Sequence, residues 1–429
     1  MVSIAEILKG RHTGKAVELR GWIYRTRSVG GKAFVVVRDA TGIVQVALSR
    51  DSVPPEAFTA AEKALIESAV IVHGKVVEDK RAPGGFEIRA DDFKVVHFAE
   101  KFPIQEDLSE EYLLDVRHLW VRSQRMTTIF RIRHATFGAV HEYFRDHGFW
   151  EVHPPMITPS GSEGGSTLFE LDYFGRKAHL TQSWQLYAEA LVLAMEKIYY
   201  IGPSFRAEKS RTTRHLTEYW HAEMEQAWAG MDDVIKHAEG AISHACQRVA
   251  EERPDDIVAM GRTPEFLKAV KPPFERMTYD DALKILKKKG MDIEWGKDLR
   301  TLEERALTEG KSRPIVVTHY PRVTQAFYKA RDPKHPDLVL AFDVIGGDGV
   351  GEIVGGSERE TDLEAIKKGL KEQGEDPKAY EWYLDSRRFG SVHHAGFGMG
   401  MERLIQWICK LDHIRDAVSF PRTPGRFAP

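Results

Sequence analysis

The first hundred residues alternate short apolar and polar positions in the manner of β-strands. Segment 17–22 places apolar and polar residues in turn, and turn-forming residues separate it from the runs that follow. Further β-rich runs lie at 33–37, 43–48, 70–77, 86–88 and 93–98. Segment 56–68 is rich in alanine and glutamate and predicts a helix after the third strand. Five strands with a helix between the third and the fourth are typical of an OB-fold barrel.

A long amphipathic helix is predicted beyond the barrel. Residues 99–123 mix charges with a proline and few β-branched residues, which predicts a hinge. Across 124–147, apolar side chains recur at steps of three or four residues on one face. They are Met126, Ile129, Phe130, Phe137, Val140 and Phe144. The pattern divides the chain into a barrel domain at 1–98, the hinge at 99–123 and a second domain at 124–429.

The second domain mixes helices and strands. Residues 232–253 predict an amphipathic helix, and the lysine-rich residues 271–313 are helical in tendency, so a helical insertion is expected at about 230–313. Strands are predicted at 314–318, 339–344 and 394–398, and a helix at 401–410. The fold class is therefore α+β, with a five-stranded barrel at the N-terminus.

Composition narrows the class of protein. The 429 residues carry 61 Lys+Arg against 64 Asp+Glu, a formal net charge of −3, with 42% hydrophobic and 29% charged residues. This composition excludes a mainly disordered or collagen-like chain. No apolar stretch approaches the roughly 18–20 residues that cross a bilayer, and the N-terminus lacks a secretory pattern. Two cysteines, Cys246 and Cys409, exclude a disulfide scaffold. We expect a cytoplasmic enzyme or binding protein without a membrane partner.

A local basic cluster lies in the predicted barrel. Residues 20–38 hold five cations and no acid, with Trp22, Tyr24 and Phe34 between them. Cations that follow phosphates and rings that stack on bases are how such barrels bind single-stranded nucleic acid. The alternative is that Trp22 fills the core and the arginines form a solvated rim.

Three further groups of residues are candidates for chemistry. Arg206 and Glu208 precede a cationic loop that ends at Tyr219, which suits a nucleotide but also a solvated charged hairpin. The glycine-rich run 396–400 before Arg403 would leave a strand with few side chains, on which a ligand can lie. The alternative is that these glycines serve only the fold. Asp343 and Glu352, at the ends of adjacent strands, either hold a hard cation or decorate the surface. No spacing typical of zinc sites occurs.

In this order the groups closely resemble a class II aminoacyl-tRNA synthetase of the aspartate, asparagine and lysine subgroup. The family's three motifs match residues 148–155, 205–219 and 396–403, and the closing run 420–426 also matches. The resemblance covers nearly the whole chain. It implies a six- or seven-stranded antiparallel catalytic sheet flanked by helices, an N-terminal anticodon-binding barrel, and a homodimer formed around the first motif.

The resemblance implies a role for each residue of the nucleotide site. Arg206 would bind the α-phosphate of ATP and the carboxylate of the amino acid, and Glu208 would bind the adenine amine. Tyr219 and Arg403 would enclose the adenine ring. Arg214 and His215 would lie near the triphosphate. Arg206 and Arg403 are therefore the expected catalytic residues.

Metal and tRNA ligands follow from the same resemblance. Asp343 and Glu352 match the ligands of Mg²⁺ that accompanies ATP, with Glu352 also at the nucleotide. The barrel residues expected at the anticodon of tRNA are Arg25, Arg27, Phe34 and Gln45. The reaction would join the amino acid carboxylate to the α-phosphorus of ATP, giving an aminoacyl-adenylate and pyrophosphate, and then transfer the acyl group to the 3′-hydroxyl of tRNA. A carboxylate is ionised at neutral pH, so the first step needs no general base.

The resemblance implies an amino-acid pocket that favours asparagine over aspartate. Aspartate-specific relatives usually carry a lysine at the position of Ala188, and its loss, just before Glu189, removes a cation that would attract a carboxylate. Arg359 matches the arginine that holds the substrate side-chain oxygen. Glu223 stands where those relatives more often have Asp, and we expect it to repel an aspartate side chain. Glu163 would hold the substrate ammonium, and Gln182 and Gln185 are also expected in the pocket.

Other functions remain open at this point. An aspartyl enzyme, perhaps acting on both tRNAs, has the same motifs. A paralogue that makes free asparagine would typically lack the barrel that this chain has. A nucleic-acid-binding protein with an inactive catalytic fold would not require Arg206, Glu208, Glu352 and Arg403 together.

Overall fold

The computed structural model describes residues 2–104, 108–159, 161–162, 167–209 and 212–429. It contains two compact units, 1–127 and 128–429, which are described separately. Within the described residues, no helix combines the length and the apolar character needed to cross a bilayer.

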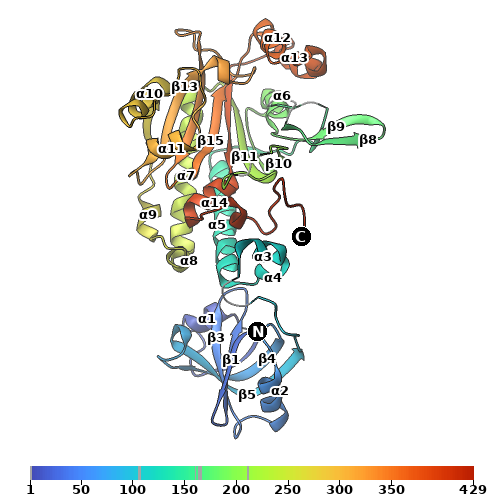
Figure 1. Cartoon of the computed structure of the whole chain (residues 1–429), viewed down its shortest axis with the longest axis vertical. Coiled ribbons are helices and arrows are strands. Elements are labelled where there is room, and N and C mark those ends of the chain that lie inside the picture. Colours follow the sequence, from blue (N-terminus) through green and yellow to red (C-terminus); the bar gives the residue numbers. More distant parts are fainter. Residues whose placement is uncertain (1, 105–107, 160, 163–166, 210–211) are drawn as a thin grey trace. The chain divides into compact units, whose positions relative to one another are not determined.

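The first unit contains a closed five-stranded barrel, coloured blue in Figure 1. Its strands are β1 (Ala16–Val29), β2 (Lys32–Arg38), β3 (Ile43–Ser49), β4 (Ala69–Glu78) and β5 (Phe86–His97), in the closed order β1-β2-β3-β5-β4. Helix α2 (Pro55–Lys63) lies between β3 and β4. Alternate residues of each strand fill the interior, as in β3, where Val44, Val46 and Leu48 are buried. The predicted OB-fold is confirmed.

Several short elements of the first unit were not predicted. Helix α1 (Ile4–Leu8) begins at Ser3, whose side chain accepts from Glu6 N–H, and a 3₁₀ turn, η1 (Pro83–Gly85), precedes β5. The runs at 86–88 and 93–98 are parts of one strand rather than two. The predicted hinge segment contains helices α3 (Glu110–Asp115) and α4 (Arg117–Trp120) and is grouped with the barrel.

The second unit is built on an eight-stranded sheet. In spatial order its strands are β12 (Glu275–Thr278), β13 (Ile315–Pro321), β14 (Leu338–Gly346), β15 (Gly351–Glu358), β16 (His394–Gly400), β11 (Glu218–Ala227), β10 (Lys197–Phe205) and β6 (Trp150–Glu151). The six central strands are antiparallel, and the edge strands β12 and β6 pair in parallel with β13 and β10. The expectation of six or seven antiparallel strands therefore holds for the centre of the sheet and is wrong at both edges.

Helices surround this sheet (Figure 1). The predicted long helices are confirmed as α5 (Gln124–Asp146), α7 (Met231–Glu252) and α14 (Met401–Cys409). Helix α6 (Gln185–Met195) packs on β10 and β11, and α7 packs on β14, β15 and β16. The remaining helices are α8 (Pro254–Ala259), α9 (Pro264–Lys268), α10 (Tyr279–Lys288), α11 (Thr301–Thr308), α12 (Leu363–Glu372) and α13 (Glu381–Arg388), with 3₁₀ turns η3 (Arg322–Thr324), η4 (Pro377–Tyr380) and η5 (Ile414–Ala417).

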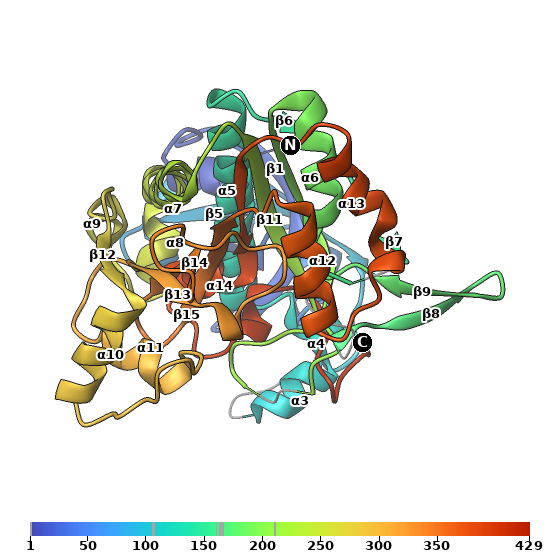
Figure 2. The same cartoon turned by 90° about the horizontal axis from the view of Figure 1, so that it is seen from above.

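Two smaller features complete the second unit. Strands β7 (Ile157–Thr158), β8 (Glu170–Tyr173) and β9 (Arg176–Leu180) form a separate sheet, whose β8–β9 hairpin projects in Figure 2. The lysine-rich segment 271–313, expected to be helical, contains α10 and α11 but also β12. Because β12 extends the main sheet, this segment is part of the sheet's edge.

Candidate active site

One row of residues crosses four neighbouring strands of the large sheet. Strand register places Asp343 beside Gly355, Gly355 beside Gly398, and Gly398 beside Glu223. Gly355 and Gly398, here called the glycine floor, leave backbone uncovered between a carboxylate at each end. A Cβ at Gly355 would lie 2.8 Å from Glu352 Oε1, and one at Gly398 would lie 2.4 Å from His221 Nε2. A side chain at 398 would displace the His221 ring, and one at 355 would displace the end of the Glu352 side chain, so glycine at both positions keeps the backbone open to a ligand.

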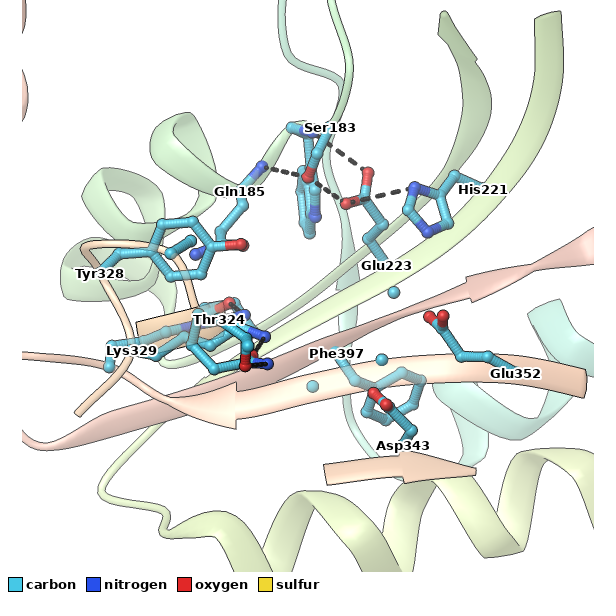
Figure 3. Close-up of a pocket in the computed structure, with 18 of the residues that line it drawn as sticks. Ser183, Gln185, His221, Glu223, Thr324, Tyr328, Lys329, Asp343, Glu352 and Phe397 are labelled. Carbon is cyan, nitrogen blue, oxygen red and sulfur yellow. Dashed lines mark hydrogen bonds and ion pairs between the residues drawn. The ribbon is translucent and has the colours of Figure 1, made fainter. Parts of the chain in front are cut away.

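A cavity of about 570 Å³ lies over this floor. Figure 3 shows Ser183, Glu223 and His221 on one side of it, with Asp343 and Glu352 on the other. Arg206, Glu352, His221 and Gly398 also line a smaller adjoining cavity. The other predicted residues at this smaller cavity are Glu208, Arg214, His215, Tyr219 and Arg403. The second and third sequence motifs thus meet at one place, although they are far apart along the chain.

Arg206, Arg214 and Arg403 supply the guanidinium groups of this smaller cavity. The Cζ atom of Arg206 lies 5.7 Å from the centroid of the Tyr219 ring. Arg403 lies in the first turn of α14. Its Nη1 donates to the backbone oxygen of Glu352 over 2.6 Å and lies 3.8 Å from the carboxylate of the same residue. A planar guanidinium can bind a phosphate, and an aromatic ring can stack on a base, so the pair is well suited to a nucleotide.

Arg214 is less available than the sequence suggested. Its side chain is buried and forms an ion pair with Glu304 of α11, while Nη2 donates to Thr301 Oγ1 over 2.6 Å. The Cβ of any residue other than glycine at 351 would overlap its Nη1. Arg214 therefore lines the smaller cavity with its charge already balanced, and it holds α11 against the loop of the second motif.

The positive potential of these arginines is visible in two neighbouring histidines. Burial, with the charges of Arg403, Arg214 and Arg206, lowers the pKa of His215 to about 4. Burial, with Arg206 and Arg403, lowers the pKa of His221 to about 3. The carboxylate of Glu223, 3.5 Å from His221 Nδ1, does not offset these effects. Both rings are neutral at pH 7, and the cavity attracts anions.

We expect these histidines to make the protein less stable in mild acid. His221 titrates near 6.5 when unfolded and near 3 when folded, so the unfolded state binds more protons in between. The free energy of unfolding should therefore decrease as the pH is lowered. His221 alone should account for a loss of about 2 kcal/mol when the pH is lowered from 7 to 5. Urea unfolding at both pH values checks this. His221→Gln should lose correspondingly less, and an identical loss in both proteins would contradict the assignment.

Asp343 and Glu352 converge at the other end of the floor. Asp343 lies within β14 rather than at its end, and Glu352 lies at the start of β15. A Cβ at Gly355 would meet an oxygen of each, at 3.5 Å and 2.8 Å. Burial and the nearby charge of Glu352 raise the pKa of Asp343 well above its usual value. Two carboxylates that repel each other in the wall of a cavity are typical of a site for a cation.

Glu223 occupies the opposite end and is buried. Its carboxylate accepts from the Ser183 hydroxyl and, over 3.1 Å, from Trp184 N–H. Ser183 Oγ also accepts from Gln185 N–H over 3.1 Å. These bonds come from the turn that begins α6, so the turn fixes the direction of the Glu223 carboxylate. The result is an acidic group at the side of the cavity away from Asp343.

Arg359 is a buried cation in the wall of the same large cavity. It is buried directly after β15, and its Nε and Nη2 donate to the two oxygens of Glu225 over 3.0 Å and 2.9 Å. Its Nη1 donates to Ser357 Oγ over 2.9 Å. The bidentate pair with Glu225 sets the plane of the guanidinium, which lines the cavity together with Glu223.

The remaining predicted pocket residues differ in position. Gln185 lines the large cavity. Gln182 is buried with its amide donating to Thr167 Oγ1 over 2.6 Å, and it is not part of the described cavity wall. Ala188 packs in an apolar cluster with Trp184 and Val192. Glu163 lies outside the described residues.

The predicted anticodon residues share the outer face of the barrel. Register places Arg25, Val36 and Gln45 in one row across β1, β2 and β3, and Arg27 and Phe34 in the next. The Arg27 Cζ lies 5.2 Å from the Phe34 ring centroid. Trp22 is 44% exposed, so the alternative in which it fills the barrel core is wrong. Aromatic and cationic side chains on one barrel face are suited to unpaired bases.

Comparison with family models agrees with both units. Residues 109–424 match the class II tRNA synthetases that are grouped as D, K and N, and residues 17–96 match the OB-fold nucleic acid binding domain. The chain belongs to the class II tRNA synthetases of this group. The family predicted from the order of the motifs is confirmed.

The similarity of this synthetase to known proteins extends over almost its whole length. The asparagine–tRNA ligase of Thermococcus gammatolerans is 48% identical over 422 residues, covering 98% of each chain. That of Symbiobacterium thermophilum is 42% identical over 427 residues, again covering 98% of each. The crystal structure of asparaginyl-tRNA synthetase from Pyrococcus horikoshii complexed with asparaginyl-adenylate superposes with a TM-score of 0.96 at 46% identity, covering 100% of this chain and 99% of that one.

Sequence reasoning missed several residues of the synthetase's cavity. Tyr328, Lys329 and Asp298 line it, and Lys329 carries a charge that lowers the pKa of both Asp298 and Asp343 against the effect of burial. All three lie in segments between regular elements, where no spacing rule applies. A signal that could have found two of them is the aromatic–aromatic–lysine run at 327–329, which ends nine residues before the strand of Asp343 begins.

Proposed function

We propose that this synthetase attaches asparagine to its tRNA through an asparaginyl-adenylate. The observation that carries the proposal is that buried Glu223 and Arg359 both line the large cavity over the glycine floor. A carboxylate that accepts and a guanidinium that donates are complementary to the two ends of a carboxamide. Full-length relatives at 42–48% identity carry the name asparagine–tRNA ligase, which supports the same substrate.

The first chemical step joins asparagine to AMP. An oxygen of the substrate α-carboxylate attacks the α-phosphorus of ATP, the new O–P bond forms, and the bond to pyrophosphate breaks. The attacking group is already ionised, so the barrier lies in bringing two anions together in line. Arg206, which lines both cavities, is placed to bind both anions and to stabilise charge that develops between them.

The remaining residues of the smaller cavity hold the nucleotide. Tyr219 and Arg403 suit the two faces of adenine, and Glu208 suits its exocyclic amine, since a carboxylate accepts N–H donors. Neutral His215 can accept or donate a hydrogen bond without adding charge. In the second step the 3′-hydroxyl of the terminal adenosine of tRNA attacks the activated carbonyl, and AMP leaves.

Asp343 and Glu352 fit Mg²⁺. They supply only oxygen ligands, and among the described residues no third His, Cys, Asp or Glu completes a metal cluster with them. Mg²⁺ commonly takes one or two carboxylates and completes its shell with phosphate oxygens and water. Bound there with ATP, it would neutralise phosphate charge. Its removal is expected to stop adenylate formation.

Weakening this pair should raise the requirement for magnesium. We expect Asp343→Asn to increase the Mg²⁺ concentration for half-maximal exchange at least tenfold, because one charged ligand becomes neutral. A magnesium titration of ATP–pyrophosphate exchange measures this. Asp348→Asn, on the adjacent exposed turn, is the matched control and should leave the titration unchanged. An unchanged midpoint in Asp343→Asn would remove this residue from the metal site.

The barrel face should contribute to tRNA binding and not to adenylate formation. We expect Phe34→Ala to raise the KM for tRNA about tenfold, since one stacked base is worth about 1–3 kcal/mol. Asparagine-dependent exchange, which needs no tRNA, should stay within twofold of the parent. Aminoacylation and exchange assays on the same sample give both values. Equal losses in the two assays would indicate damage to the fold instead.

Exposed apolar residues near the edge strand β6 support a homodimer. Trp150 of β6 is 62% exposed, and Ile157 of β7 is 44% exposed. Trp150 lies in the first sequence motif, which the family uses between subunits, and Ile157 lies two residues beyond that motif. Sedimentation of the purified protein tests this: a dimer that Trp150→Asp converts to monomer is expected.

Paired exchange assays test the substrate. We expect ATP–pyrophosphate exchange with asparagine and at least a hundredfold lower kcat/KM with aspartate. Equal use of both amino acids would identify a non-discriminating enzyme, and preference for aspartate would identify an aspartyl enzyme. Absence of exchange with either would favour a binding protein with an inactive catalytic fold, and tRNA-independent release of free asparagine from aspartate would identify the paralogue.

A further inference from the structure

A fully buried carboxylate lies behind the wall of the large cavity. Glu189 of α6 does not line the cavity, yet four side chains on α6, α13 and β16 surround its carboxylate. Gln185 Nε2 and Tyr383 Oη each donate to it at 2.9 Å, Arg387 Nη2 also donates, and His394 Nε2 lies 3.2 Å from it. A carboxylate that is buried so completely requires such a set of donors.

The charge of Glu189 is balanced within this cluster. The side chains of Glu189 and Arg387 are 0% and 1% exposed. Burial by itself would raise the pKa of Glu189, but the charge of Arg387 and the hydrogen bond from His394 lower it below its usual value. Glu189 is therefore an ionised group, and both of its oxygens can only accept hydrogen bonds.

This fact fixes the orientation of Gln185. An amide can present either its oxygen or its NH₂ group, and only the NH₂ group can donate to a carboxylate. Glu189 Oε1 thus holds Gln185 Nε2, and the oxygen of the same amide remains for the cavity that Gln185 lines. The backbone N–H of Gln185 is also held, by Ser183 Oγ, so the residue has little freedom.

We propose that Glu189 is a positioning residue of the amino-acid site, which keeps the Gln185 oxygen available to accept from the substrate ammonium. The inference rests on the proposed function. Glu223 and Arg359 suit the substrate carboxamide, whereas an ammonium has three donors and needs acceptors. With Glu189 in place, Gln185 offers one without having to choose between two orientations.

The test withdraws the carboxylate while keeping its charge. Glu189→Asp shortens the side chain by one carbon–carbon bond, about 1.5 Å, and leaves an anion for Arg387. We expect the KM for asparagine in ATP–pyrophosphate exchange to rise about tenfold, with kcat within twofold and the KM for ATP unchanged. Asp256→Asn, which weakens the ion pair with Arg131 between α5 and α8, is the control and should change none of the three constants.

A second background separates positioning from mere packing. Gln185→Met removes the amide and should itself raise the KM for asparagine about tenfold. In that background Glu189→Asp should add less than twofold, because the group through which it acts is gone. A full tenfold effect in both backgrounds would overturn the proposal. If Glu189→Asp does not fold, Tyr383→Phe removes one donor to Glu189, and its expected threefold effect should likewise vanish beside Gln185→Met.

Failure of the proposed function gives a different result. In that case the parent protein itself shows no asparagine-dependent exchange, whatever the variants do. A parent that is active with asparagine, combined with an effect of Glu189→Asp on kcat or on the KM for ATP only, would reject the positioning role and leave the function standing.

Discussion

Arg206→Met is expected to lower kcat/KM for asparagine-dependent exchange about 10³-fold, which corresponds to about 4 kcal/mol of transition-state stabilisation. Arg206 lines both cavities, and its guanidinium lies over Tyr219 where the two substrates would meet. Two anions must approach there in a partly dehydrated site, and removal of a single donor from such a site costs about 10²–10³-fold. Because the Arg206 guanidinium is charged and has several N–H donors, we expect its removal to cost an amount at the upper end of that range.

Exchange kinetics with saturating magnesium measure this effect. Lys209→Met is the matched control, since Lys209 is an exposed cation three residues further along the same loop, and it should change kcat/KM less than twofold. Circular dichroism should show the same fold for all three proteins. A loss of less than tenfold for Arg206→Met would assign the stabilisation of the transition state to other groups.

Glu223→Gln is expected to reduce the ratio of kcat/KM for asparagine over aspartate about a thousandfold. At about 4 Å and an effective dielectric constant near 20, repulsion between two carboxylates is worth about 4 kcal/mol, and the substitution removes it. Glu223 is held by Ser183 and Trp184 N–H and cannot turn away from an aspartate side chain. Arg359, which pairs with Glu225, would remain in the cavity wall as a hydrogen-bond donor to the aspartate carboxylate.

Parallel exchange assays with both amino acids give this ratio. Glu218→Gln, at the exposed start of the same strand, carries the same chemical change and should leave the ratio unaltered. If the ratio of Glu223→Gln equals that of the parent, discrimination does not depend on this charge, and the absence of a lysine at 188 would have to account for it.

The repeat of apolar residues along the sequence was sufficient to predict the elements that bury one regular face. The strands of the barrel alternate buried and exposed residues, and α5, α7 and α14 repeat apolar residues on one face. Strand β12 was missed because its four residues, Glu-Arg-Met-Thr, gain their order from parallel pairing with β13. The interruption at 89–92 divided β5 in the pattern; the structure has a bulge there, and β5 pairs with β4 on both sides of it.

The site was predictable as far as its motifs extend. Arg206, Tyr219, Glu352 and Arg403 meet at one cavity, as the motif order implied. What could not be predicted is which charges cancel each other. Arg214 pairs with Glu304, 90 residues away, and Arg359 with Glu225, 134 residues away. Such partners are brought together by strand order, which no local pattern encodes.

The glycine floor has a consequence for inhibitors. Peptide groups at 355 and 398 present the same shape and dipoles in any protein that keeps these two residues, and a Cβ at either would collide with Glu352 or His221. A compound that gains its affinity from this surface would therefore bind alike those related enzymes that keep both glycines. Selective compounds must instead reach the side chains at the two ends of the row.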